Sequence, residues 1–298
     1  MARRLYVIGN GFDIHHGIPS GYRDFGDYAK RADRSLCDTL DRYFVADELW
    51  SDFESALAHL DIEALIEDAS AQLTGYGADD WRDSANHDYQ WEIGQVVQAV
   101  SIKLRRLFGI WIRSLKIPSP EAVSDKLLKL DANAIFLSFN YTPTLQHLYE
   151  IQDSQVLHIH GAASRPDSEL VLGHGWRRSV ADSLNFRADP ESIDFRILEG
   201  NRIIDRYFSD TFKPSDKIIN QNAHFWKSLG SVSEVFVLGH SLAPVDHPYF
   251  QAMCDELRTR NITWTVSYYG SIGDKPAQLA ALGVQASAVR YVELSQLR

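Results

Sequence analysis

The chain is poor in cysteine. Cys37 and Cys254 lie far apart in the sequence, and no Cys-x-x-Cys pair occurs. Two isolated thiols cannot form a disulfide framework or a four-cysteine zinc ribbon. The sequence therefore excludes the small disulfide-stabilised folds, and it predicts two free thiols in a reducing compartment.

Positive charge and long apolar runs are also scarce. Lysine and arginine number 30 against 40 aspartates and glutamates, which gives a formal net charge of -10. This balance argues against a nucleic-acid-binding surface as the main function. No apolar run approaches the length of a membrane span, and the residues before Gly9 hold too few apolar positions for the core of a signal peptide. We expect a cytoplasmic protein with neither a membrane nor a nucleic acid as a direct partner.

Apolar residues are plentiful. Of the 298 residues, 45% are hydrophobic and 11% are aromatic, which is enough for a sizeable core. Short apolar or β-branched runs alternate with helical patterns, and this alternation predicts an α/β fold with a parallel sheet flanked by helices. The predicted strands are residues 5–8, 134–139, 156–159, 235–238 and 263–269.

Two segments interrupt the alternation of strands and helices. Residues 28–130 show helical periodicity in 49–69 and 91–115, and we interpret them as a large helical insertion after the first strand. Residues 163–221 have a mixed pattern that we interpret as a lid-like insertion. The prediction is one α/β domain over residues 1–298 that carries both insertions.

A glycine-rich turn follows the first predicted strand, with Gly9 and Gly11 on either side of Asn10. Such glycines let the backbone turn sharply, and they let a phosphate approach the amino end of a helix. The dinucleotide-binding fingerprint would need a third glycine where Ile14 stands. The turn alone is therefore compatible with a steric role and with ligand binding.

Polar residues follow two later strands. Asn140 comes after the strand at 134–139, and His160 comes after the strand at 156–159. The carboxyl ends of parallel strands meet at one edge of a sheet, so these two side chains should converge on the crevice beside Gly9. His158 should point to the opposite face of its strand and is interpreted as structural.

The order of these motifs resembles that of sirtuin-like NAD-binding domains. The Gly-x-Gly turn is followed by Gly17-Ile18-Pro19 and by Tyr22-Arg23, then by Ser-Phe-Asn-Tyr and His-Ile-His-Gly, and finally by Leu238-Gly-His-Ser-Leu242. More narrowly, Gly-Asn-Gly-Phe-Asp, the Trp50-x-Asp-Phe-Glu54 motif and Phe-Asn-Tyr-Thr resemble the bacteriophage abortive infection AbiH family. The resemblance implies a Rossmann-like, sirtuin-like fold.

The same resemblance implies an NAD glycohydrolase that releases nicotinamide in antiphage defence, with NAD as substrate and no metal. The catalytic residues would be Asn140, which orients the ribose or a water, His160, which accepts a proton, and Asp13, which stabilises a cationic ribose. Asp13 stands where sirtuins have a small hydroxyl residue. The implied nucleotide-binding residues are Gly9, Asn10, Gly11, Phe12, His16, Ile18, Pro19, Tyr22, Gly239 and Ser241.

Other interpretations remain open from the sequence. The same pocket could bind NAD or an ADP-ribose derivative as a sensor without turnover. His158-x-His160 could contribute to a metal site for nucleotide or nucleic-acid hydrolysis, although no acid lies nearby in the sequence. Glu54 could be a second acid near the ribose, but as a residue off the apolar stripe of its helix it is first interpreted as solvated.

Two partners are expected besides the nucleotide. An enzyme that consumes NAD has to stay silent in healthy cells, so we expect a trigger derived from the phage. We also expect a homo-oligomer that forms through the helical insertion.

Overall fold

A six-stranded, all-parallel sheet forms the centre of the computed structural model, which describes residues 3–45, 49–79, 81–83, 85–189, 191–258 and 260–297. The strand order is β3-β2-β1-β4-β5-β6, which is the order of the doubly wound α/β fold. The strands are β1 (Arg3–Ile8), β2 (Ile135–Ser138), β3 (Val156–His158), β4 (Val232–Leu238), β5 (Thr263–Tyr268) and β6 (Val289–Glu293).

The central strands are apolar because helices cover both of their faces. The last four residues of β1 are buried, and so is every residue of β2. Leu5 pairs with Ile135 on one side and with Val235 on the other, so the register sets apolar side chains of three strands beside one another. A continuous apolar run is the expected signature of such a strand.

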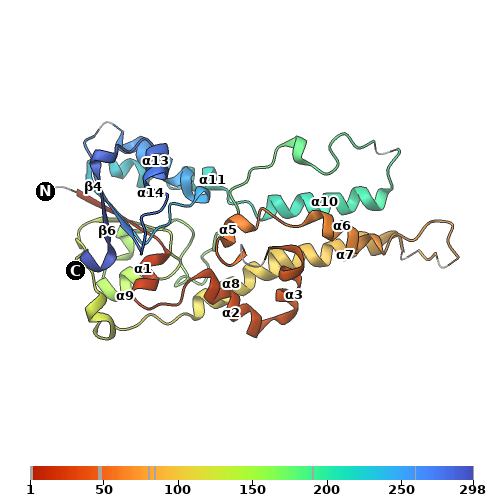
Figure 1. The fold of residues 1–298 in the computed structure, drawn as a ribbon, viewed down its shortest axis with the longest axis horizontal. Helices are drawn as coiled ribbons and strands as arrows, with labels where there is room; N and C mark the ends of the chain where they lie inside the picture. Colours follow the sequence, from red (N-terminus) through yellow and green to blue (C-terminus); the bar gives the residue numbers. More distant parts are fainter. Residues whose placement is uncertain are drawn as a thin grey trace. The chain divides into compact units, whose positions relative to one another are not determined.

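Two hydrophobic clusters mark the two faces of the sheet. Figure 1 shows helices on both sides of the sheet. One face packs against α11 (Ser215–Gln221), α12 (Ala223–Ser228), α13 (His247–Leu257) and α14 (Lys275–Ala281). The other face packs against α1 (Asn10–His15) and α9 (Thr144–Tyr149).

The contacts divide the chain into two compact units. The sheet unit comprises Met1–Asp24, Gly109–Val171 and Pro214–Arg298, and the helical unit comprises Phe25–Phe108 and Leu172–Lys213. The other helices are α2 (Tyr22–Ala32), α3 (Arg34–Tyr43), α5 (Phe53–Ala56), α6 (Ile62–Ser70), α7 (Ala85–Gln98), the π-helix η1 (Ala99–Lys103), α8 (Leu104–Ser114) and α10 (Phe195–Asp210).

Close packing of α7 against α10 organises the helical unit. A Cβ on Gly200 of α10 would lie 2.5 Å from the Tyr89 ring and 2.8 Å from Ile93, both on α7. Arg196 at the start of α10 is buried, forms an ion pair with Asp194 and stacks over the ring of Tyr76. These contacts fix the segment before α7 to the start of α10.

The predicted α/β fold with a parallel sheet flanked by helices is confirmed, and all five predicted strands are present. The strand β6 was not predicted. The helical pattern of residues 49–69 is split into α5 and α6, because Asp61 accepts a hydrogen bond from the Ala64 N–H and so begins a new helix. The predicted bounds of the two insertions stay predictions, as does the prediction of a single domain.

Within the described residues, no helix is long and apolar enough to cross a membrane.

Candidate functional site

The candidate site lies at the carboxyl edge of four neighbouring strands of the sheet unit. Gly9 follows β1, Asn140 lies just beyond β2, His160 lies just beyond β3, and Gly239 follows β4. The chain leaves β1 toward β2 on one side, whereas β4 lies on the other side of β1. Ligands of open α/β sheets bind at such a reversal of strand order.

Three glycines lock two of these strand ends together. A Cβ on Gly9 would lie 2.5 Å from the Cα of His240, and a Cβ on Gly11 would lie 2.9 Å from the carbonyl oxygen of Gly239. Gly239 has φ +67°, and a Cβ there would lie 2.0 Å from the backbone nitrogen of Phe12. The Gly9 N–H donates to Leu238 O and the Gly11 N–H to Gly239 O. The Gly-x-Gly turn therefore has a packing role, which the sequence left open.

The Gly17-Ile18-Pro19 segment is tied back to α1. The Ile18 N–H donates to the carbonyl of Asp13 at 3.0 Å, and Gly17 adopts φ +81°, which favours glycine. The Asn10 side chain donates to the carbonyl of Ser20 at 3.0 Å and accepts from the Ser20 hydroxyl at 2.5 Å. The segment is thus a closed loop built on the helix that carries Asp13.

His16 is buried and is bonded at both ring nitrogens. Nδ1 lies 2.7 Å from the carbonyl oxygen of Phe12, and Nε2 lies 2.7 Å from the hydroxyl of Tyr149. Burial lowers the pKa of His16 to about 4, so the imidazole is neutral at physiological pH. These bonds account for His16 structurally, and its predicted contact with a nucleotide stays a prediction.

Asp13 is a buried acid with an incomplete set of partners. Its side chain is only 1% exposed, and Thr142 donates a short hydrogen bond to Oδ2. Among the described residues Oδ1 has no hydrogen-bond partner. Burial raises the pKa of Asp13 to about 6, and the nearby Thr142, Thr144 and Asn140 side chains oppose this rise.

Asn140 is the second incomplete group at this edge. Its side chain is buried, and neither end of its amide finds a hydrogen-bond partner in the part of the chain that the structure describes. The amide lies close enough to lower the pKa of Asp13 but does not meet hydrogen-bond geometry. Buried polar atoms are nearly always paired in native proteins, so unpaired ones point to a missing ligand or water.

His160 faces an acid that was not among the predicted site residues. Its Nε2 lies 3.5 Å from Oδ1 of Asp246, and Nε2 of His240 lies 3.4 Å from Oδ2 of the same carboxyl. All three side chains are buried. A His–Asp–His cluster therefore lies beside the strand ends.

Aromatic rings surround the cluster. Phe139 contacts His160 and His240 edge-on, with ring centroids 5.3 Å and 4.4 Å apart. Tyr249 lies 5.5 Å from the His160 ring, and Phe250 lies 5.0 Å from the His240 ring. Such low-polarity surroundings screen a charge on Asp246 less than water would.

The remaining predicted residues differ in exposure. Phe12 and Ile18 are buried in the packing of α1, Tyr22 is half-buried, and Pro19 and Ser241 are exposed. His158 is bonded to the Asn140 carbonyl at 2.9 Å, as expected for a structural residue. The structure thus brings Asp13 and Asn140 together, whereas nucleotide binding by the predicted residues stays a prediction.

Glu54 is not the solvated acid of the first interpretation. It is buried in the helical unit, and the Lys213 ammonium lies 2.8 Å from Oε1 and 2.9 Å from Oε2. Lys213 itself is only 1% exposed. The lysine that draws Glu54 inward lies too far along the chain for a local pattern to show it.

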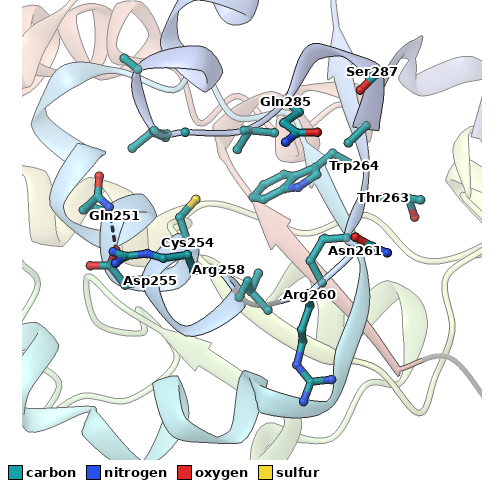
Figure 2. Close-up of a pocket in the computed structure, with 17 residues that line it drawn as sticks. Gln251, Cys254, Asp255, Arg258, Arg260, Asn261, Thr263, Trp264, Gln285 and Ser287 are labelled. Atoms are coloured by element: carbon teal, nitrogen blue, oxygen red, sulfur yellow. Dashed lines mark hydrogen bonds and ion pairs between the residues drawn. The ribbon is translucent and has the colours of Figure 1, made fainter.

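A separate cavity lies at the opposite edge of the sheet (Figure 2). It has a volume of about 700 Å³ and lies beside Thr263 and Ala288, next to the amino ends of β5 and β6. The indole of Trp264 and the thiol of Cys254 face it. Burial raises the pKa of that thiol to about 12, which makes it a poor nucleophile. None of the predicted site residues lines this cavity.

No group of three or more histidine, cysteine or acidic side chains could hold a metal ion in the described ranges of the chain.

Fold and site together define a doubly wound α/β protein with buried, incompletely bonded polar groups at the reversal of its strand order. The family is given by a family model described as bacteriophage abortive infection AbiH, which matches residues 5–268. The chain therefore belongs to the AbiH family, and membership suggests a role in phage abortive infection. No curated protein and no solved structure matches the chain significantly.

Proposed function

We propose that the protein hydrolyses the bond between nicotinamide and ribose in NAD, and that this reaction depletes NAD in a phage-infected cell. The observation that carries the proposal is the pair of incomplete polar groups at the switch point, Oδ1 of Asp13 and both ends of the Asn140 amide. The proposal adopts the sirtuin-like classification that the motif order implies.

A ribose fits these groups chemically. Its vicinal hydroxyls both donate and accept, so one sugar can satisfy the amide oxygen and the amide nitrogen of Asn140 while it donates to Asp13. Leaving buried partners unpaired is costly, so a site of this kind strongly favours a ligand that bonds to all of them. A negatively charged Asp13 would also stabilise the positive charge that the ribose develops when nicotinamide departs.

His160 supplies the proton acceptor in this proposal. The C–N glycosidic bond breaks with its electron pair on nicotinamide, a water oxygen forms the new bond to the ribose carbon, and the proton of that water moves to His160. The imidazolium then releases the proton to solvent. The products are nicotinamide, ADP-ribose and one proton.

The geometry limits how the diphosphate could bind. The N–H groups of Gly9 and Gly11 already donate to carbonyl oxygens of the β4 strand end, and α1 has only six residues. In the proposal the glycines keep the loop thin, and Pro19 and Ser241 are predicted nucleotide-binding residues that are exposed.

Nicotinamide release from NAD by the purified protein, with and without chelator, tests the proposal. We expect turnover that resists the chelator and falls at least about a hundredfold in Asn140→Ala and in His160→Ala, since general-base catalysis alone contributes about that much. His147→Gln, which changes an exposed histidine on α9, is the matched control and should keep wild-type turnover.

Nucleotide binding without turnover is the outcome that would overturn the proposed enzymatic activity. If calorimetry shows that NAD or ADP-ribose binds, and NAD levels in phage-infected cells that express the protein stay constant, the chain is a nucleotide sensor. Turnover that the chelator abolishes would instead favour a metal-dependent hydrolase.

We also propose that two copies associate through the exposed face of α7 and η1. Trp91 and Ile102 are each 60% exposed on this face. In residues 85–113 the acidic residues come before the basic ones. The acidic residues are Asp88 and Glu92, and the first basic residue is Lys103. Antiparallel pairing of two copies would set the acidic half against the basic half. Light scattering of the wild type and of Trp91→Ser measures this association.

A further inference from the structure

Asp246 joins two histidines that come from different strand ends. The His160 imidazole is delivered by the end of β3, the His240 imidazole by the end of β4, and each directs Nε2 to its own oxygen of the Asp246 carboxyl, at 3.5 Å and 3.4 Å. Asp246 itself comes just before α13 and is only 7% exposed. A carboxylate so deeply buried needs partners of opposite polarity.

The hydrogen bonds of His240 fix its protonation. The Leu242 N–H donates to Nδ1 of His240 at 2.8 Å, so Nδ1 carries no proton. The proton of the neutral ring is therefore on Nε2, which faces Asp246. Leu242 holds this position with φ +64°, a left-handed conformation that is strained for a leucine. Backbone strain kept at a strand end beside a buried histidine indicates that the fixed tautomer matters.

The geometry points to Asp246 as the positioning residue of His160, which it orients through Nε2 and stabilises as an imidazolium, while His240 holds the carboxyl in place from the other side. This inference rests on the proposed function, because it assigns His160 the role of proton acceptor. The inference adds Asp246, which belongs to none of the motifs that resemble sirtuin-like domains.

In this assignment the carboxylate of Asp246 stabilises a protonated His160. When His160 accepts the proton of the attacking water it becomes positively charged inside a ring of aromatic side chains. A carboxylate 3.5 Å away stabilises that charge far more in such surroundings than in water. His240 does not compete for the same oxygen, since its Nε2 faces Oδ2.

Among the described residues, the titratable side chains in contact with His160 include Asp246, Tyr141 and Tyr249, and His240 contacts the same carboxyl. The contact with Asp246 brings a carboxyl oxygen to 3.5 Å from Nε2 of His160.

The experiment compares Asp246→Asn with the wild type in three measurements. We expect kcat to fall about tenfold to a hundredfold with KM unchanged, which is less than the loss on removing His160. The acid limb of the pH–rate profile should move to lower pH, because the imidazolium has lost its stabilising charge. The NMR titration of the His160 ring, assigned with His160→Gln, should move in the same direction. Asp246→Glu should restore part of the rate.

The NMR titration separates the two proposals because it needs no turnover. If the wild type is inactive but the titration moves as expected, the proposed function fails and the link between Asp246 and His160 stands. If the wild type is active and neither the titration nor the pH profile moves in a folded Asp246→Asn, the inference is overturned. His240→Gln, which removes the second imidazole, serves as the second variant and should shift the titration by a smaller amount.

Discussion

Asp13 in the sheet unit and Glu54 in the helical unit are both buried acids, yet their surroundings differ. Glu54 lies against the ammonium group of Lys213, and both oxygens are within 3 Å of it. Asp13 receives a hydrogen bond from Thr142, and no lysine or arginine of the described residues is among the groups that set its pKa. Glu54 has a neutralising partner, whereas Oδ1 of Asp13 has no hydrogen-bond partner in the part of the chain that the structure describes.

This difference is the one expected between a structural acid and a functional one. A buried ion pair is satisfied within the protein, so it contributes to the specificity of the fold but offers nothing to a ligand. An acid that is buried without a counter-charge costs stability, and such a cost persists where a ligand or a reaction uses the group. The two acids look alike in the sequence because each lies in a helical segment, directly after a phenylalanine.

Replacing Lys213 should cause the largest change in the free energy of unfolding. Lys213→Met leaves Glu54 buried without its partner, and we expect a loss of about 3 to 5 kcal/mol in the free energy of unfolding, measured by urea denaturation. The double variant Lys213→Met/Glu54→Leu should recover most of that loss. Lys30→Met, at an exposed position of α2, is the control. A loss in the single variant no larger than in the control would show that the pair contributes nothing to stability.

Replacing Asp13 should raise the free energy of unfolding at neutral pH, whereas replacing Lys213 should lower it. The pKa of Asp13 is about 6 in the folded state and 3.8 in the reference state, so the folded protein loses stability as the pH rises from about 4 to about 6. Two pKa units correspond to about 3 kcal/mol. Asp13→Asn removes this term, so its stability advantage over the wild type should grow from near zero at pH 4 to about 3 kcal/mol at pH 7.

Urea denaturation of both proteins at several pH values measures this growth, with Asp52→Asn, an exposed acid, as the control. A stability difference that is the same at every pH would mean that Asp13 is not the group with the raised pKa. Loss of nicotinamide release in a variant that is more stable than the wild type would identify Asp13 as a functional acid.

Removing the Thr142 hydroxyl should cause the smallest change in the free energy of unfolding. Thr142→Val keeps the volume of the side chain but removes the donor to Asp13, so the pKa of Asp13 should rise further and stability at pH 7 should fall by about 2 kcal/mol. In the Asp13→Asn background the same change should cost less. Equal costs in both backgrounds would show that the hydroxyl does not act through the charge of Asp13.

The sequence predicts the fold where a local pattern suffices. Continuous apolar runs predict β1 and β2, whereas β6 reads Val-Arg-Tyr-Val-Glu, a short edge strand with an exposed arginine that resembles a loop. The positions of Asn140 and His160 just beyond strand ends are predictable from the sequence. The partners of these residues are not predictable in this way, because Asp246 lies 86 positions after His160 and only the folded sheet brings the two together.

The close approach of Gly9 and Gly11 to the end of β4 has a mechanical consequence. Since Gly9 and Gly11 lie within contact distance of the Gly239 and His240 backbone, the β1 loop and the β4 loop have no room to slide past one another. A ligand that pushes on the loop carrying Asp13 therefore also pushes on the strand end that carries His240, and through it on Asp246. A change of shape at the proposed ribose-binding side would therefore reach the imidazole pair through these backbone contacts.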